Sequence, residues 1–151
     1  MGSTFVRADD SAKPLIDPAA ANVVEQFKPS SADVTVTAGT AAEPGVVITI
    51  KRGNEGYPGV DLKPAGGTWD LSAFGHVEAT FVNTGKTGVG IAVRLDNAGD
   101  WKDNPWNTEQ TYLKPGATGK VKVIFGYAYD HKPNYKLNPA AIINLKIFCG
   151  K

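Results

Sequence analysis

Short segments of alternating apolar and polar residues recur along this chain about every ten residues, with Gly, Pro, Asn or Asp between them. Alternation with a period of two places every second side chain on the same face of an extended strand. No apolar stripe of helical period persists for ten residues, and the best helical candidate, 18–26, is short and rich in Ala. The pattern predicts an all-β chain, and specifically an antiparallel β-sandwich of the jelly-roll type.

Two pairs of predicted strands lie close enough in sequence to form hairpins. Segments 33–37 and 46–51 are separated by a stretch that contains Gly and Pro, and segments 76–82 and 89–96 by a turn at 83–88. In the last of these strands we expect Ile91, Val93 and Leu95 to face the core and Ala92, Arg94 and Asp96 to face outward. The other predicted strands are 4–7, 23–27, 59–63, 110–113, 120–125 and 141–148.

The length and composition fit one globular domain. A chain of 151 residues with 42% apolar residues is long enough to bury a substantial core. The sequence divides into residues 1–22, which we interpret as a cloning remnant, a lead-in strand and a linker, and residues 23–151, the predicted sandwich. We expect this domain to be a monomer.

The charge balance argues against two classes of partner. The formal net charge is +1, from 16 Lys and Arg against 15 Asp and Glu, so neither nucleic acid nor an anionic membrane is an expected partner. No apolar run approaches the roughly 18 residues that span a bilayer, and no apolar signal segment follows Met1. The single cysteine, Cys149, excludes an internal disulfide, and we expect it to be a small buried side chain.

The sequence carries no recognisable catalytic motif. The only histidines are His76 and His131, and neither belongs to a zinc helix or stands beside a nucleophile elbow. Paired acids can hydrolyse glycosidic bonds, but no candidate acid lies in an apolar sequence context that would raise its pKa above that of a neighbour. The candidates are Glu55, Asp61, Asp96, Asp100, Asp103, Glu109 and Asp130. We therefore expect the domain not to be an enzyme.

One polar stretch, 95–113, carries two tryptophans without apolar periodicity. An indole contributes most when it is buried, so Trp101 and Trp106 either fold back onto the protein or contact a ligand. Trp69 lies at the start of a predicted strand, where we expect it to belong to the core.

Five short motifs resemble those of the β-jelly-roll carbohydrate-binding modules that are attached to bacterial agarases and related polysaccharide hydrolases. The order of the motifs along the chain is similar too. They are YPGV at 57–60, WDLS at 69–72, VNTG at 82–85, VRLDN at 93–97 and LKPG at 113–116.

The resemblance implies a function without catalysis. Such a module binds an algal or plant cell-wall polysaccharide and targets an attached glycoside hydrolase to it, and the resemblance further implies a bacterial protein that is secreted or on the cell surface. Similar modules often hold a structural Ca²⁺, so the resemblance allows for such an ion in this domain without indicating its ligands. They also commonly carry one more C-terminal strand, so here either the lead-in strand 4–7 pairs in its place or the sheet is one strand short.

The candidate ligand-binding residues combine flat rings with polar rims, because a sugar ring has an apolar face of C–H groups and a rim of hydroxyls. Arg94 and Asp96 project from the outward side of their strand, although a solvated ion pair is an alternative interpretation. The aromatic candidates are Trp101, Trp106, Tyr57, Tyr127 and Tyr129, and the last two point the same way if their segment is extended.

Two other classes of function remain open. A structural spacer or adhesion domain would pack both loop tryptophans inward, whereas a carbohydrate-binding module would expose at least one. A small glycan-cleaving enzyme would release reducing ends from its substrate, and we expect none.

Overall fold

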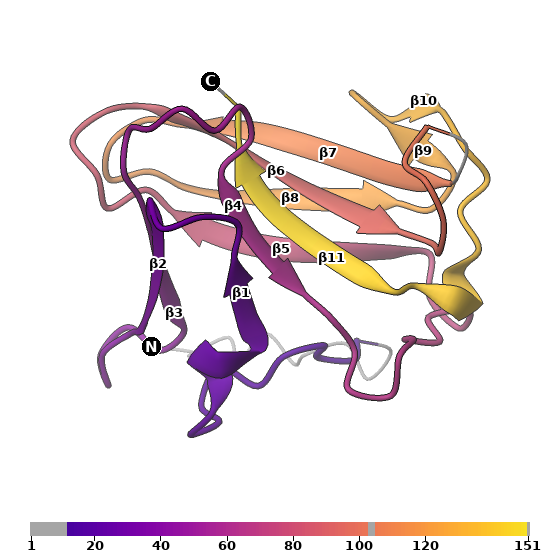
Figure 1. Ribbon diagram of the computed structural model, residues 1–151, viewed down its shortest axis with the longest axis horizontal. Coiled ribbons are helices and arrows are strands. Elements are labelled where there is room, and N and C mark those ends of the chain that lie inside the picture. The colour runs from indigo at the N-terminus through magenta and orange to yellow at the C-terminus, as the bar shows by residue number, and fades with distance from the viewer. Residues whose placement is uncertain (1–11, 103–104, 151) are drawn as a thin grey trace, which may run out of the picture.

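The computed structural model describes residues 12–102 and 105–150, and the larger of its two layers is a five-stranded sheet (Figure 1). The strand order is β1-β4-β11-β6-β7, and every pair is antiparallel. The strands are β1 (Phe27–Pro29), β4 (Gly59–Leu62), β6 (Val89–Asp96), β7 (Trp106–Leu113) and β11 (Asn144–Cys149). β11 lies at the centre, between β4 and β6.

The second layer consists of two separate ribbons. One pairs β2 (Val34–Ala38) with β3 (Val46–Ile50), and the other pairs β5 (His76–Val82) with β8 (Thr118–Ile124). A small ribbon of β9 (Tyr127–Ala128) and β10 (Lys132–Pro133) lies beside one end of β7 (Figure 1). In the described part of the chain the helices are two 3₁₀ turns, η1 (Val23–Gln26) and η2 (Pro139–Ala141).

The core lies between the five-stranded sheet and the two ribbons. Val60, Val93 and Leu95 from the sheet and Val121 and Val123 from β8 are all at most 1% exposed. Each such side chain contributes about 1.5–3 kcal/mol through the removal of apolar surface from water. The alternation in the sequence therefore predicted the inward faces correctly, and the all-β antiparallel sandwich is confirmed.

One predicted hairpin is confirmed and the other is wrong. β2 and β3 pair as expected, with Val36 opposite Ile48. β5, however, pairs with β8, while β6 joins the other layer between β11 and β7. The side chain of Asn83 accounts for this crossing, because its amide donates to the carbonyls of Thr87 and Leu113 and so ties the 83–88 loop to the end of β7.

Several elements differ from the prediction in their bounds. The expected strand 23–27 is the 3₁₀ turn η1 followed by β1, because Val23 and Phe27, four residues apart, both turn toward the core. β7 begins at Trp106 and not at residue 110, so residues 106–109 of the polar stretch 95–113 belong to a strand that was predicted to begin later. In WDLS, Trp69 packs against the core, as expected, but forms only an isolated bridge with Ile142.

The N-terminal part of the chain is only partly described. Leu15 and Ile16 pack against the core, whereas the predicted strand 4–7 lies outside the described residues. No helix of the described segments is long and apolar enough to cross a membrane.

Candidate functional site

A groove of about 760 Å³ lies on the outward face of the five-stranded sheet. It is at the end where β6 leads into the connection to β7 that carries Trp101, which we call the tryptophan loop. Three strands supply its floor, because outward positions of β4, β6 and β11 stand side by side in register. The lining residues are Lys28, Pro29, Asp61, Lys63, Arg94, Asp96, Asn97, Gly99, Asp100, Trp101, Pro105, Trp106, Ile143 and Asn144. Four of the seven candidate binding residues, Arg94, Asp96, Trp101 and Trp106, therefore meet in one place.

Arg94 and Asp96 form an ion pair along one strand. Arg94 Nε lies 2.8 Å from Asp96 Oδ1, and the two side chains are only 29% and 14% exposed. The Nε–H is buried and not aligned with any acceptor among the described residues, so the contact is an ion pair without a well-directed hydrogen bond. The alternative of a solvated cross-strand pair is thus not what the structure shows.

Asn144 completes the polar floor from the neighbouring strand β11. Its amide nitrogen donates to Asp61 Oδ1 at 2.8 Å and to Asp96 Oδ2 at 3.2 Å. Its own carbonyl oxygen is buried and has no hydrogen-bond partner among the described residues. The floor consequently offers carboxylate oxygens that Asn144 holds in place and a guanidinium, which together can accept from and donate to hydroxyl groups.

Trp106 stands at one side of the groove and is half-buried. Its indole N–H donates to the carbonyl of Trp101 at 3.0 Å, and its ring makes edge contacts with Tyr129 and Tyr135, with centroids 6.1 and 5.6 Å away. The guanidinium of Arg94 lies 5.8 Å from its ring centroid. Trp106 therefore connects the floor of the groove with the tryptophan loop and with the loop after β8, which carries Tyr129 and Tyr135.

Trp101 has a different environment. It is 62% exposed, and the Nζ of Lys102 lies 5.7 Å from its ring centroid. Asn97 fixes the base of this loop, since its side chain donates to the carbonyls of Asn138 and Ala141 and accepts from the Asn138 N–H. An exposed indole on an anchored loop is suited to contact a ligand.

The loop that follows β8 is held by two polar side chains, Asn107, which sequence reasoning missed, and Glu109, which it named only as a candidate acid. Asn107 is fully buried, accepts from the Gly126 N–H and donates to the Tyr135 carbonyl. Glu109, 7% exposed, accepts from the N–H groups of Asp130 and His131. Both occupy inward positions of β7, where alternation along the strand could have indicated their direction.

Glu109 stabilises an unusual backbone. Tyr129, Asp130 and His131 are three consecutive residues with left-handed φ angles of 46°, 64° and 58°. Such conformations are costly for residues other than Gly, so the carboxylate and the ring of Trp106 offset that cost. Because Tyr129 is left-handed, the segment is not extended, and the condition under which Tyr127 and Tyr129 were expected to point the same way does not hold.

The three tyrosine candidates lie outside the groove lining. Tyr129 borders the groove through Trp106, and Tyr127 lies in β9 beyond it. Tyr57 is 64% exposed and makes an edge contact with Phe148, with ring centroids 5.9 Å apart, at the other end of β11. The structure thus places Tyr57 on the same side of the sheet as the groove but at a distance from it.

No group of three or more His, Cys, Asp or Glu side chains is arranged to hold a metal ion among the described residues, and the candidate acid Asp103 lies outside them. The carboxyls with a lowered pKa lie elsewhere: hydrogen bonds from Ser72 lower the pKa of Asp70, and a hydrogen bond from Lys120 lowers that of Glu78.

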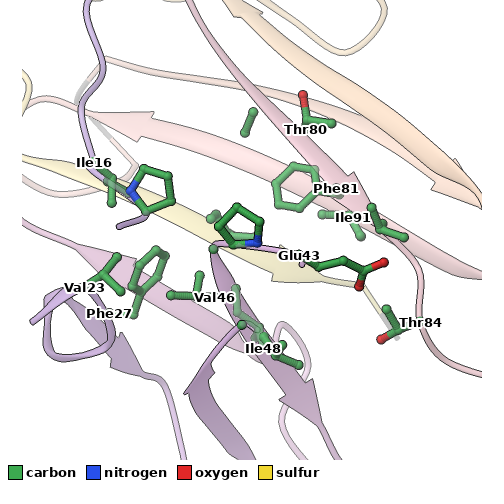
Figure 2. Close-up of a pocket in the computed structure, with 18 of the residues that line it drawn as sticks. Ile16, Val23, Phe27, Glu43, Val46, Ile48, Thr80, Phe81, Thr84 and Ile91 are labelled. Carbon is green, nitrogen blue, oxygen red and sulfur yellow. The ribbon is translucent and has the colours of Figure 1, made fainter. Parts of the chain in front are cut away.

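A second, apolar cleft of about 550 Å³ opens where the second layer divides into two ribbons. Figure 2 shows that side chains from both layers point into it, among them Val46 from β3 and Phe81 from β5 in the second layer and Ile91 from β6 in the sheet. Cys149, which we expected to be buried, is half-buried at its wall, and burial raises the pKa of its thiol. This cleft was not predicted from the sequence, because alternation predicts which face a side chain occupies and not the gaps between ribbons.

Solved structures with a similar fold include two agarases. The crystal structure of the agarase AgWH50C superposes with a TM-score of 0.65 and 15% identity over 91% of this chain. The fold is similar to that of part of this agarase. An exo-β-agarase superposes with a TM-score of 0.65 and 14% identity over 90%, and the chain spans only 22% of each agarase. No family model and no curated protein matches the chain.

Proposed function

We propose that this domain binds a polysaccharide without cleaving it, in the groove on the outward face of the five-stranded sheet. The observation that carries the proposal is one exposed indole, Trp101, beside a fixed polar floor made by Arg94, Asp96 and Asn144. An indole face matches the C–H face of a sugar, and paired donors and acceptors match its hydroxyls. Asp61 and Trp106 extend these two kinds of contact on either side.

The charges that line the groove favour a hydroxyl-rich ligand. Lys28, Lys63 and Arg94 stand against Asp61, Asp96 and Asp100, so three cations balance three acids and neither sign dominates. A balanced set of donors and acceptors suits a glycan better than the phosphate backbone of a nucleic acid, which would require an excess of positive charge.

The likeness to agarases supports a role in glycan degradation. The chain covers 22% of the length of each agarase, so we infer an accessory domain that holds an attached hydrolase on its substrate. Secretion or display on a bacterial surface follows from that role, because the cell-wall polysaccharides that such hydrolases degrade are outside the bacterial cell. The 62% exposure of Trp101 speaks against a spacer domain, which would shield every indole.

Affinity electrophoresis tests the proposal. Agarose, carrageenan, xylan and a soluble cellulose derivative are cast in native gels, and we expect at least one to retard the wild type. Trp101→Ala should abolish the retardation, whereas Lys122→Ala, an exposed change on the outward side of β8, should not alter it. Failure of every glycan to retard the wild type would overturn the proposal, and release of reducing ends would indicate an enzyme instead.

A further inference from the structure

The outward face of the sheet carries a second group of exposed aromatic rings at the far end from the groove. Tyr112 on β7 is 68% exposed, and Tyr57 is 64% exposed where it contacts Phe148 of β11. A large apolar ring in water is unfavourable unless it has a partner, and two such groups at one sheet end form a candidate contact surface.

The register of the strands places these rings on either side of β6. Gly90 of β6 lies opposite Tyr112 of β7, and Ala92 lies opposite Phe148 of β11. Since β11 and β7 flank β6, these two strands lie roughly 10 Å apart, twice the spacing of neighbouring strands, and Phe148 and Tyr112 are offset by two positions along them. Between them β6 carries Ala92, which is 7% exposed, and Gly90, which has no side chain.

The same strand leads from these rings to the groove. The outward residues of β6, read from the groove, are Asp96, Arg94, Ala92 and Gly90, so the floor changes from charged to small along one straight path. Asp96 and Gly90 are six positions apart, which corresponds to about 20 Å of extended strand. That length accommodates several sugar rings.

We infer that the ligand is an extended oligosaccharide that lies along β6. One end of it is bound in the groove, and the other end contacts Tyr112 and Phe148, whose ring is supported by an edge contact with Tyr57. This inference rests on the proposed function and adds to it the length and direction of the bound glycan. It also assigns a binding role to Tyr112, whose hydroxyl lies so close to Gly88 that a Cβ there would overlap it. Gly88 thus lets Tyr112 lie against the sheet.

The test compares ligands of different length. Titration calorimetry measures the affinity of saccharides of two, four and six sugars cut from agarose, or from whichever polymer of the gel panel retards the protein. We expect the wild type to bind the hexasaccharide at least tenfold more tightly than the disaccharide. Tyr112→Ala should remove about five- to tenfold of that gain and leave disaccharide binding within twofold of wild type.

Gly90→Gln supplies an independent variant that should fold normally. A Cβ at Gly90 meets no atom within 4 Å, and its backbone φ is not left-handed, so the new side chain would occupy only the path of the glycan. We expect it to weaken hexasaccharide binding as Tyr112→Ala does, while Thr80→Gln on the outward side of β5 changes nothing.

The outcomes separate the two proposals. If the hexasaccharide binds no more tightly than the disaccharide, or if both variants leave its affinity unchanged or weaken both ligands equally, the extended site is wrong while glycan binding stands. If no polysaccharide of the panel binds the wild type, the proposed function fails and the extended site fails with it.

Discussion

The two outward faces of the sandwich are built from different side chains. The face of the β5–β8 ribbon carries an exposed ion pair, in which Lys120 Nζ lies 2.8 Å from Glu78 Oε1 and the side chains are 55% and 41% exposed. The face of the five-stranded sheet also carries an ion pair, Arg94 with Asp96, but there the side chains are 29% and 14% exposed and tryptophans flank them. The same pairing chemistry is thus solvated on one face and recessed on the other, and a recessed site with an exposed ring can recognise a ligand.

The largest expected effect concerns the two tryptophans of the recessed face. Trp106→Ala should lower the free energy of unfolding by roughly 2–4 kcal/mol, because the ring and its N–H join two loops to the sheet. Trp101→Ala should change stability by less than about 0.5 kcal/mol, since its ring is mostly in water. Both should lose glycan binding. Urea unfolding and affinity gels measure the two quantities separately, and equal destabilisation by both variants would contradict the distinction.

The next prediction compares the contributions to stability of two glutamates, the buried Glu109 and the exposed Glu78. Glu109→Ala should cost roughly 1–3 kcal/mol, because two backbone N–H groups in a left-handed turn lose their acceptor. Glu78→Ala, on the solvated face, should cost under about 1 kcal/mol. Glu109→Gln, which keeps an acceptor oxygen, should recover part of the loss. Thermal unfolding of the three variants checks this, and a Glu109→Ala protein as stable as wild type would refute the anchoring role.

The ion pairs themselves give a third, smaller comparison. Arg94→Ala removes the partner of the recessed Asp96 and should cost about 1–2 kcal/mol of stability and about tenfold in glycan affinity. Lys120→Ala removes the partner of an exposed acid and should leave glycan affinity unchanged, with a stability change within about 0.5 kcal/mol. Calorimetry on both variants measures stability and glycan affinity. Equal effects of the two substitutions would contradict the claim that the burial of the ion pair, and not its charge, distinguishes the two faces.

The smallest expected effect is a pH dependence on the solvated face. The hydrogen bond from Lys120 holds the pKa of Glu78 below its ordinary value of 4.5. A lowered folded-state pKa stabilises the protein above the unfolded value, and that contribution is lost as the pH falls through the folded pKa. Below about pH 4.5 the wild type should therefore lose a fraction of 1 kcal/mol more than Glu78→Gln does, an effect that 1 M salt should reduce. Identical slopes of stability against pH would contradict it.

These contrasts also show what the sequence could and could not predict. Alternation placed Val93 and Leu95 inward and Arg94 and Asp96 outward, because the direction of a side chain is a local property of a strand. It did not predict that β5 pairs with β8, since a strand's partner is set by the whole fold and here by the buried Asn83.

The candidate site, like the fold, could be predicted only in part from the sequence. The end of the predicted strand 89–96 and the polar stretch that follows it indicated Arg94, Asp96, Trp101 and Trp106, and these four residues line one groove. Asn144 was missed, because an isolated Asn at the start of a strand has no distinctive pattern. Its role depends on the register that places it between two acids from other strands.

The three tryptophans allow the central claim, that a glycan lies on the outward face of the five-stranded sheet, to be tested directly. In a ¹H–¹⁵N spectrum each indole N–H gives its own signal, and Trp69 packs against the core while the other two border the groove. Saturation with a binding oligosaccharide should shift the signals of Trp101 and Trp106 and leave that of Trp69 in place. A spectrum in which the glycan binds but neither of those two signals moves would contradict the account.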